Sequence, residues 1–168
     1  VGMMNPDHLL KIQNELIESF KHDKIFKFLH LPIQSGNNKI LKEMKRQYKV
    51  QDFEDQIDLF RIAIPKISIM TDIIVGFPGE TVKEFSDTIN CLRKISPDYT
   101  NVSKFWARPK TPAEKMKNQI DDAEIKRRSR ITKEISQNIS QLRHEIWFGW
   151  EGNIILTKKG DEENEWIG

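Results

Sequence analysis

The residue with the clearest chemical potential is Asp72, a carboxylate inside an otherwise apolar run. Residues 71–81 read TDIIVGFPGET, which predicts a buried strand, a tight turn and the start of a helix. Gly76 allows the backbone to bend or a ligand to approach closely. A structural strand–helix turn alone would explain the glycines, but it would not explain Asp72, because an unpaired carboxylate is costly to bury. We therefore expect Asp72 to be paired or to face a site.

Polar side chains gather at the ends of three predicted strands, residues 25–33, 67–75 and 99–106. These strands alternate with amphipathic helices, which predicts a parallel sheet with helical crossovers. Ligands of such sheets bind at the carboxyl ends of the strands. The residues predicted there are His30, Gln34, Ser35, Gly36, Asp72, Gly76, Phe77, Lys104, Trp106, Arg108 and Thr111, with Arg46 on the helix after the first strand. This set suits a ligand with a ribose, a carboxylate and a flat base.

The elements that position these residues follow from the hydrophobic pattern. Helices are predicted at about 6–20, 38–47, 50–63 and 81–94. A polar, proline-containing stretch leads to a long helix at about 121–147, and residues 153–158 read as a further strand. We predict an organisation into residues 1–118, 119–148 and 149–168. Both ends resemble the interior of larger units, so we expect the chain to be part of a longer protein.

Composition restricts the function classes. The 168 residues carry 27 basic and 25 acidic side chains, so bulk charge does not indicate a nucleic-acid partner. The single cysteine, Cys91, excludes a disulfide framework or a multi-cysteine cluster site within this chain and favours a buried inert thiol. There is no apolar run of membrane-spanning length and no recognisable signal peptide, which predicts a cytoplasmic protein without a membrane partner. P-loop, dinucleotide-binding and Ser-His-Asp patterns are absent.

Four blocks, in order, resemble a known family. They are residues 30–37 (HLPIQSGN), 44–48 (MKRQY), 71–81 and 105–113 (FWARPKTPA). Over residues 3–116 these blocks are similar to the radical S-adenosylmethionine (SAM) methylthiotransferases. Residues 44–53 and the Ala113-x-x-Met116 ending are most similar to the branch that acts on threonylcarbamoyladenosine beside the tRNA anticodon. The isopentenyladenosine branch and the ribosomal-protein branch match less well.

The resemblance implies a fold and a cofactor. The fold would be α/β, half of a partial (β/α)6 TIM-type barrel, of which this chain would supply strands four to six. A long linking helix would lead to the beginning of a TRAM-like RNA-binding β-barrel. The implied cofactor is SAM, with Gln34 and Asp72 on its ribose hydroxyls and Arg46 on its carboxylate. The full set of implied cofactor-binding residues is Gln34, Ser35, Arg46, Asp72, Ile74, Gly76, Phe77 and Arg108.

This sequence departs from the family pattern in two respects. The cysteines that hold the family's two 4Fe-4S clusters are absent, so we expect both clusters in the full-length protein, neither of them bound by this chain. The chain alone is therefore expected to be inactive. Lys110 also stands where the family has a glycine in the Arg-Pro-Gly-Thr-Pro-Ala block, so this loop carries a long side chain at the position where the family's backbone approaches a substrate.

A basic cluster opens the long helix: Lys126, Arg127, Arg128 and Arg130. It fits tRNA phosphate contacts or an ordinary solvated face equally well. The expected partners are tRNA and the rest of the same protein; the oligomeric state stays open.

The sequence leaves three classes of function open: part of a radical tRNA methylthiotransferase, an RNA-binding α/β module without chemistry, or an unrelated α/β hydrolase or phosphate-binding domain. The order of the four blocks argues against the last.

Overall fold

The computed structural model describes residues 2–162 and 164–167 and has the predicted α/β architecture. In this part of the chain one parallel sheet has the order β1-β2-β3, formed by Phe28–His30, Ser68–Val75 and Tyr99–Lys104. The connecting helices are α2 (Asn38–Glu43), α3 (Val50–Ala63) and α4 (Val82–Ile95), preceded by α1 (Pro6–Phe20). The predicted strands and their parallel order are confirmed, although β1 is shorter than the predicted segment.

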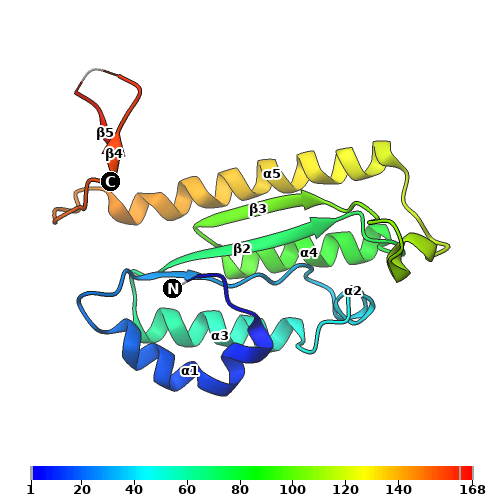
Figure 1. Cartoon of the computed structure of the whole chain (residues 1–168), viewed down its shortest axis with the longest axis horizontal. Coiled ribbons are helices and arrows are strands. Elements are labelled where there is room, and N and C mark those ends of the chain that lie inside the picture. The colour runs from blue at the N-terminus through cyan, green and yellow to red at the C-terminus, as the bar shows by residue number, and fades with distance from the viewer. Residues whose placement is uncertain (1, 163, 168) are drawn as a thin grey trace.

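One face of the sheet is buried beneath helices and the other is open (Figure 1). Along β2, Ile69, Thr71, Ile73 and Val75 are buried, whereas the residues between them are only half-buried. This alternation arises because successive side chains of a strand point to opposite faces. Asp72 lies on the open face, so the carboxylate that interrupts the apolar run of β2 is outside the core.

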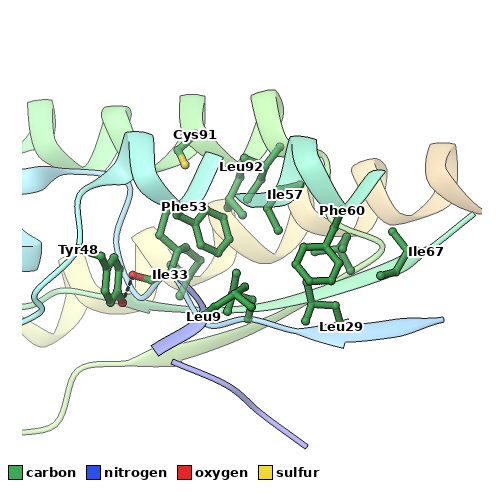
Figure 2. Packing of buried hydrophobic residues seen from close by; sticks show 14 of the residues in the cluster. Leu9, Leu29, Ile33, Tyr48, Phe53, Ile57, Phe60, Ile67, Cys91 and Leu92 are labelled. Atoms are coloured by element: carbon green, nitrogen blue, oxygen red, sulfur yellow. Dashed lines mark hydrogen bonds between the residues drawn. The ribbon is translucent and has the colours of Figure 1, made fainter. Parts of the chain in front are cut away.

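The core lies between the sheet and helices α1, α3 and α4. Figure 2 shows Phe53, Ile57 and Phe60 directed from α3 toward the strands, and all three are fully buried. The Phe60 ring meets Phe20 of α1 edge to face, with 5.7 Å between ring centres. Tyr48 closes the other end of the core. Its hydroxyl donates to the Ile33 carbonyl at 3.0 Å, and burial raises the pKa of Tyr48 to about 12.

The turn after β2 leads into a capping box formed by Thr81 and Glu84 at the start of α4. Glu84 accepts from the Thr81 backbone N–H at 2.8 Å and from the Thr81 hydroxyl, while Lys39 Nζ donates to it at 2.9 Å. These donors, led by the Thr81 hydroxyl, lower the pKa of Glu84 to about 2. The box therefore fixes the start of α4, and Lys39 ties that start to α2.

A long helix, α5 (Asp122–His144), runs beside β3 and ends in a 3-10 turn, Glu145–Trp147. The predicted range of 121–147 is thus an α-helix only to His144. Ile125, Thr132 and Ile139 are buried as the pattern predicts, but Leu142 is 64% exposed. Near this end of α5 the His144 ring lies 5.4 Å from that of Tyr99, at the beginning of β3.

The segment after α5 forms a small hairpin of β4 (Lys158–Lys159) and β5 (Trp166–Ile167). The predicted strand at 153–158 is therefore wrong in position, because Ile154, Ile155 and Leu156 stay unpaired and exposed.

A short 3-10 turn, Pro112–Lys115, lies before α5. The division of the chain into three regions stays a prediction. None of the helices in the described residues is long and apolar enough to cross a membrane.

Replacing Phe60 tests the core. We expect Phe60→Ala to lower the free energy of unfolding by about 3–5 kcal/mol, because it removes a fully buried ring and leaves a cavity. The neighbouring Leu59→Ala is the control, since Leu59 is 41% exposed and should change stability by less than about 1 kcal/mol. Denaturant unfolding measures both; equal losses would contradict this assignment of the core.

The pKa of Glu84 predicts a pH dependence. A carboxyl with a lowered folded-state pKa contributes stability above its ordinary value of 4.5 and loses that contribution as pH falls toward about 2. We expect Glu84→Gln to remove a contribution on the order of 1 kcal/mol at neutral pH and to flatten stability between pH 4.5 and 2. Denaturant titrations at each pH measure this, with the exposed Glu15→Gln as control. A wild-type slope in Glu84→Gln would rule out the effect.

Candidate functional site

A cleft of about 490 Å³ lies on the open face, at the carboxyl ends of the strands. It brings together four of the predicted cofactor-binding residues, Gln34, Asp72, Ile74 and Arg108, and the strand-end residues Lys104, Trp106 and Thr111. The parallel register places Asn101 beside Asp72 and Ser103 beside Ile74, so β3 supplies the neighbouring wall. Phe105, Trp106 and Thr111 complete the rim with other residues that follow β3. The cleft thus combines a carboxylate, amides, hydroxyls, cations and an indole that is 78% exposed.

Asp72 is held in place by His30 of β1. His30 Nε2 lies 3.2 Å from each carboxylate oxygen of Asp72, and the two side chains are 19% and 15% exposed. The imidazole therefore meets the carboxylate from one side. Lone pairs of both oxygens remain for a ligand, and a carboxylate so placed can accept two hydroxyl hydrogen bonds at once.

Gln34 joins the site through an unusual backbone conformation. Its φ of 72° lies in the left-handed region, which is uncommon for residues other than glycine and marks a functional constraint when the surroundings enforce it. The enforcing contacts are backbone hydrogen bonds: Gln34 N–H donates to Asp72 O at 2.8 Å, and Ile74 N–H donates to Gln34 O at 2.9 Å. Gln34 is thereby fixed against the same stretch of β2 that carries Asp72.

Arg46 lies in an adjoining cavity of about 330 Å³ rather than in the main cleft. Gln34 lines both cavities, so the two are neighbours. Arg46 Nε is buried and has no hydrogen-bond partner among the described residues. A buried guanidinium N–H without an acceptor is costly, and a ligand carboxylate would satisfy it with the planar geometry that arginine favours.

Three further predicted cofactor residues line neither the cleft nor the Arg46 cavity and have structural contacts instead. The Ser35 hydroxyl is buried beside Thr88 Oγ1 at 3.3 Å. Gly76 has a φ of 81°, and an added Cβ would lie 2.6 Å from Ile125 of α5, so the glycine allows α5 to approach closely. Phe77 is buried against Phe105, with 5.1 Å between ring centres. These contacts shape the turn behind the cleft; a direct role in binding stays a prediction.

The sequence reasoning left several cleft residues without a role. His30 was placed at a strand end but not paired with Asp72, and Asn101 and Ser103 were not singled out. A signal was available, because Asn101 and Ser103 alternate in the predicted third strand just as Asp72 and Ile74 do in the second. The missing information was the register between the strands, which sequence periodicity does not supply.

The basic cluster on α5 requires a correction at Arg128. Its side chain is 5% exposed, and Nη1 donates to Glu80 Oε2 at 2.8 Å and to the Glu80 carbonyl at 2.7 Å. Nε donates to Glu124 Oε1 at 2.7 Å. Arg128 therefore holds the turn before α4 against α5 and is not available to a phosphate. Lys126, Arg127 and Arg130 are exposed, and Arg127 pairs with Glu124 at 2.6 Å.

The pair formed by Arg128 and Glu80 is fully enclosed. Glu80 Oε2 also accepts from the Gly76 N–H at 2.9 Å, which ties the glycine turn to the pair. Burial raises the pKa of the Glu80 carboxyl above its ordinary value, against the opposing effects of these donors. Replacing both partners of such a pair with apolar residues is often neutral for stability, whereas removing one partner leaves an unpaired buried charge and is costly.

Among residues 2–162 and 164–167, no three histidine, cysteine or acidic side chains converge to form a metal site. The described residues therefore offer no ligand set for an iron–sulfur cluster. Cys91 is 5% exposed, and burial raises the pKa of its thiol to about 12. A thiol held protonated in this way is a poor metal ligand. The donors of the cleft instead suit hydroxyl, amide and carboxylate groups, which fits the ribose and amino-acid ends of SAM.

The parallel β/α units, with a polar cleft at the carboxyl ends of the strands, define one segment of a barrel-type α/β fold. The chain belongs to the radical SAM superfamily, whose family model matches residues 2–92.

Individual relatives show which branch of the superfamily the chain is similar to. A probable threonylcarbamoyladenosine tRNA methylthiotransferase of Pyrococcus horikoshii is 42% identical over 164 residues, covering 98% of this chain and 38% of that protein. The equivalent Methanocaldococcus jannaschii protein is 43% identical over 160 residues, covering 95% and 37%. A Homo sapiens threonylcarbamoyladenosine tRNA methylthiotransferase is 32% identical over 167 residues, covering 99% and 28%. The resemblance to this branch is confirmed, and the chain spans less than two fifths of the length of each.

Substitution of Arg128 separates the buried pair from its exposed neighbour. We expect Arg128→Met to destabilise the fold by about 3–5 kcal/mol, because it leaves Glu80 buried without its counter-charge. Arg127→Met, the adjacent control, breaks only an exposed ion pair and should cost less than about 1 kcal/mol. Denaturant unfolding measures both. Adding Glu80→Gln to Arg128→Met should recover part of the loss; no recovery would show that the charge of Glu80 is not the cause.

Proposed function

We propose that this chain is the cofactor-binding part of a radical SAM enzyme that methylthiolates N6-threonylcarbamoyladenosine in tRNA. The observation that carries the proposal is the convergence of Gln34 and Asp72 in one cleft, beside a cavity with the unsatisfied Arg46 Nε. Relatives whose names state this activity support the substrate. The full-length protein is proposed to act in the cytoplasm, with tRNA as its partner.

Each residue has a distinct task in this proposal. Asp72, oriented by His30, accepts hydrogen bonds from the two ribose hydroxyls of SAM. Gln34 binds the same ribose from the neighbouring strand, and Arg46 binds the carboxylate of the methionine part. Ile74 packs on the adenine, and Arg108 faces the substrate or the cofactor carboxylate across the cleft.

The clusters are proposed to be held by other parts of the full-length protein. Two 4Fe-4S clusters of this class need about three or four thiolates each, and this chain has one cysteine, buried and protonated. When bound, SAM and the clusters supply the radical and the sulfur chemistry. The task of the residues described here is to bind and orient SAM, and the chain without the rest of the protein is proposed to be inactive.

SAM binding by the full-length protein tests the proposal. We expect Asp72→Asn to weaken binding by about 10- to 100-fold, because an amide cannot accept from both ribose hydroxyls. His30→Ala should weaken it less, since the carboxylate remains but is no longer oriented. Asp58→Asn, an exposed change on α3, is the control. Isothermal titration calorimetry measures the affinities, and circular dichroism confirms folding. Wild-type affinity in Asp72→Asn would remove Asp72 from the site.

A further inference from the structure

A second cavity on the open side has no role in the proposed SAM site. It encloses about 570 Å³ between the outer edge of β3 and α5. Residues 99–102 form one wall, and Lys133, Ser136, Gln137 and Ser140 of α5 form the other. We call it the β3–α5 groove. Asn101 lines both this groove and the cofactor cleft, so the two are neighbours.

The groove offers polar groups that have no partner in the described residues. Ser136 is 6% exposed, and its hydroxyl has no hydrogen-bond partner there, although hydroxyls at such depth are normally bonded. Gln137 and Asn101 line the groove with exposed amide side chains. Tyr99, 47% exposed, places an aromatic ring at one end. Amides and an accessible ring are the groups that bind the edges and faces of nucleotide bases.

A row of cations borders the groove. Lys126, Arg130 and Lys133 follow one another at helical spacings of four and three, so they lie on one face of α5. All three are exposed and form no ion pair among the described residues. The positions that continue this face are Gln137, Ser140 and His144, and one turn before Lys126 stands Asp122. We call Lys126, Arg130 and Lys133 the cationic stripe.

The stripe leads from the groove to the cofactor cleft. Helix α5 runs antiparallel to β3 (Figure 1): Ile125 lies against the Gly76 turn beyond the end of β2, and His144 contacts Tyr99 at the beginning of β3. Lys126 and Arg130 are therefore near the carboxyl ends of the strands, and Lys133 borders the groove. Four helical residues span about 6 Å, a distance comparable with that between successive phosphates of an extended RNA strand.

We propose that the β3–α5 groove binds the single-stranded RNA segment adjacent to the nucleotide that enters the cofactor cleft. The cationic stripe binds its phosphates, and Tyr99 stacks on one base while Asn101 and Gln137 bond its edge. This site rests on the proposed function, because it assigns a path to the tRNA of that reaction. Charge favours RNA over an apolar peptide segment as the occupant, because three exposed cations beside the groove suit a polyanion.

The salt dependence of tRNA binding tests the stripe in the full-length protein. We expect a triple variant, Lys126→Ala, Arg130→Ala and Lys133→Ala, to lower the slope of log affinity against log salt by about two units. SAM affinity should stay at the wild-type value. The matched control replaces three exposed cations of the outer helices, Lys11, Lys83 and Arg93, by alanine. A stripe variant with the wild-type slope, or an equal loss in the control, would overturn the proposal.

Chemical protection tests the location directly. In the full-length protein without tRNA, Lys126 and Lys133 should react with an amine-specific reagent as readily as Lys11 and Lys83. Added tRNA should protect the first two and leave the other two reactive. If Lys126 and Lys133 are already unreactive without tRNA, another part of the protein covers the groove and the proposal fails. Absence of tRNA binding by the wild type would instead contradict the proposed function.

Tyr99 tests the contact with a base. We expect Tyr99→Ala to weaken tRNA binding by about tenfold without changing the salt slope, because stacking involves no phosphate. Tyr99→Phe keeps the ring and should retain most of the affinity, which separates stacking from loss of the hydroxyl. Equal affinities for Tyr99→Ala and wild type would exclude Tyr99 from the RNA site.

Discussion

The site depends on one backbone pairing, that of Gln34 with β2. After β1 ends at His30, the chain continues beside β2 and pairs again, with Gln34 N–H bound to Asp72 O and Gln34 O bound to the Ile74 N–H. These two bonds fix the register of the first strand end against the second, and they stabilise a left-handed backbone that glutamine would otherwise avoid. Without this pairing, Gln34 would have no defined position relative to Asp72. The cleft is therefore set first by main-chain hydrogen bonds and only then by its side chains.

Much of the fold could be predicted because local patterns and the global fold agree. The apolar run of residues 73–75, the Thr81–Glu84 capping box and the proline at the start of α1 each favour the element that the structure contains. The segment at 153–158 shows the limit of such reasoning. Its apolar residues favour a strand, but a strand also needs a partner, and the pairing observed starts only at Lys158. The β-propensity of a segment indicates that it tends to form a strand, but it does not identify the strand with which it pairs.

The acidic and amide residues of the candidate site could be predicted from the sequence, whereas the environments of its cationic residues could be predicted less well. Asp72 and Gln34 stand out because a polar residue at a strand end has few structural explanations. Arginine is harder to interpret, because the same side chain serves on surfaces and in buried pairs. Arg127 and Arg128 are adjacent in sequence, yet a rotation of about 100° per residue along α5 exposes one and buries the other against Glu80. Arg128 lies three residues after Ile125 and four before Thr132, on the buried face of α5, and Arg127 lies outside that face. The sequence pattern does not supply the partner on another element, Glu80.

The buried and exposed faces of α5 have different roles. One of its faces carries Arg128 and Ile125, which lock the Gly76 turn behind the cofactor cleft. Another face carries the cationic stripe beside the edge of β3. The same rigid helix thus fixes the turn that shapes the proposed SAM site and presents charges along the proposed path of the RNA. Because both faces belong to one continuous hydrogen-bonded element, the distance between the two sites is set by the helix itself. An RNA strand held by the stripe would therefore be held in a fixed position relative to the cleft in which its nucleotide must react.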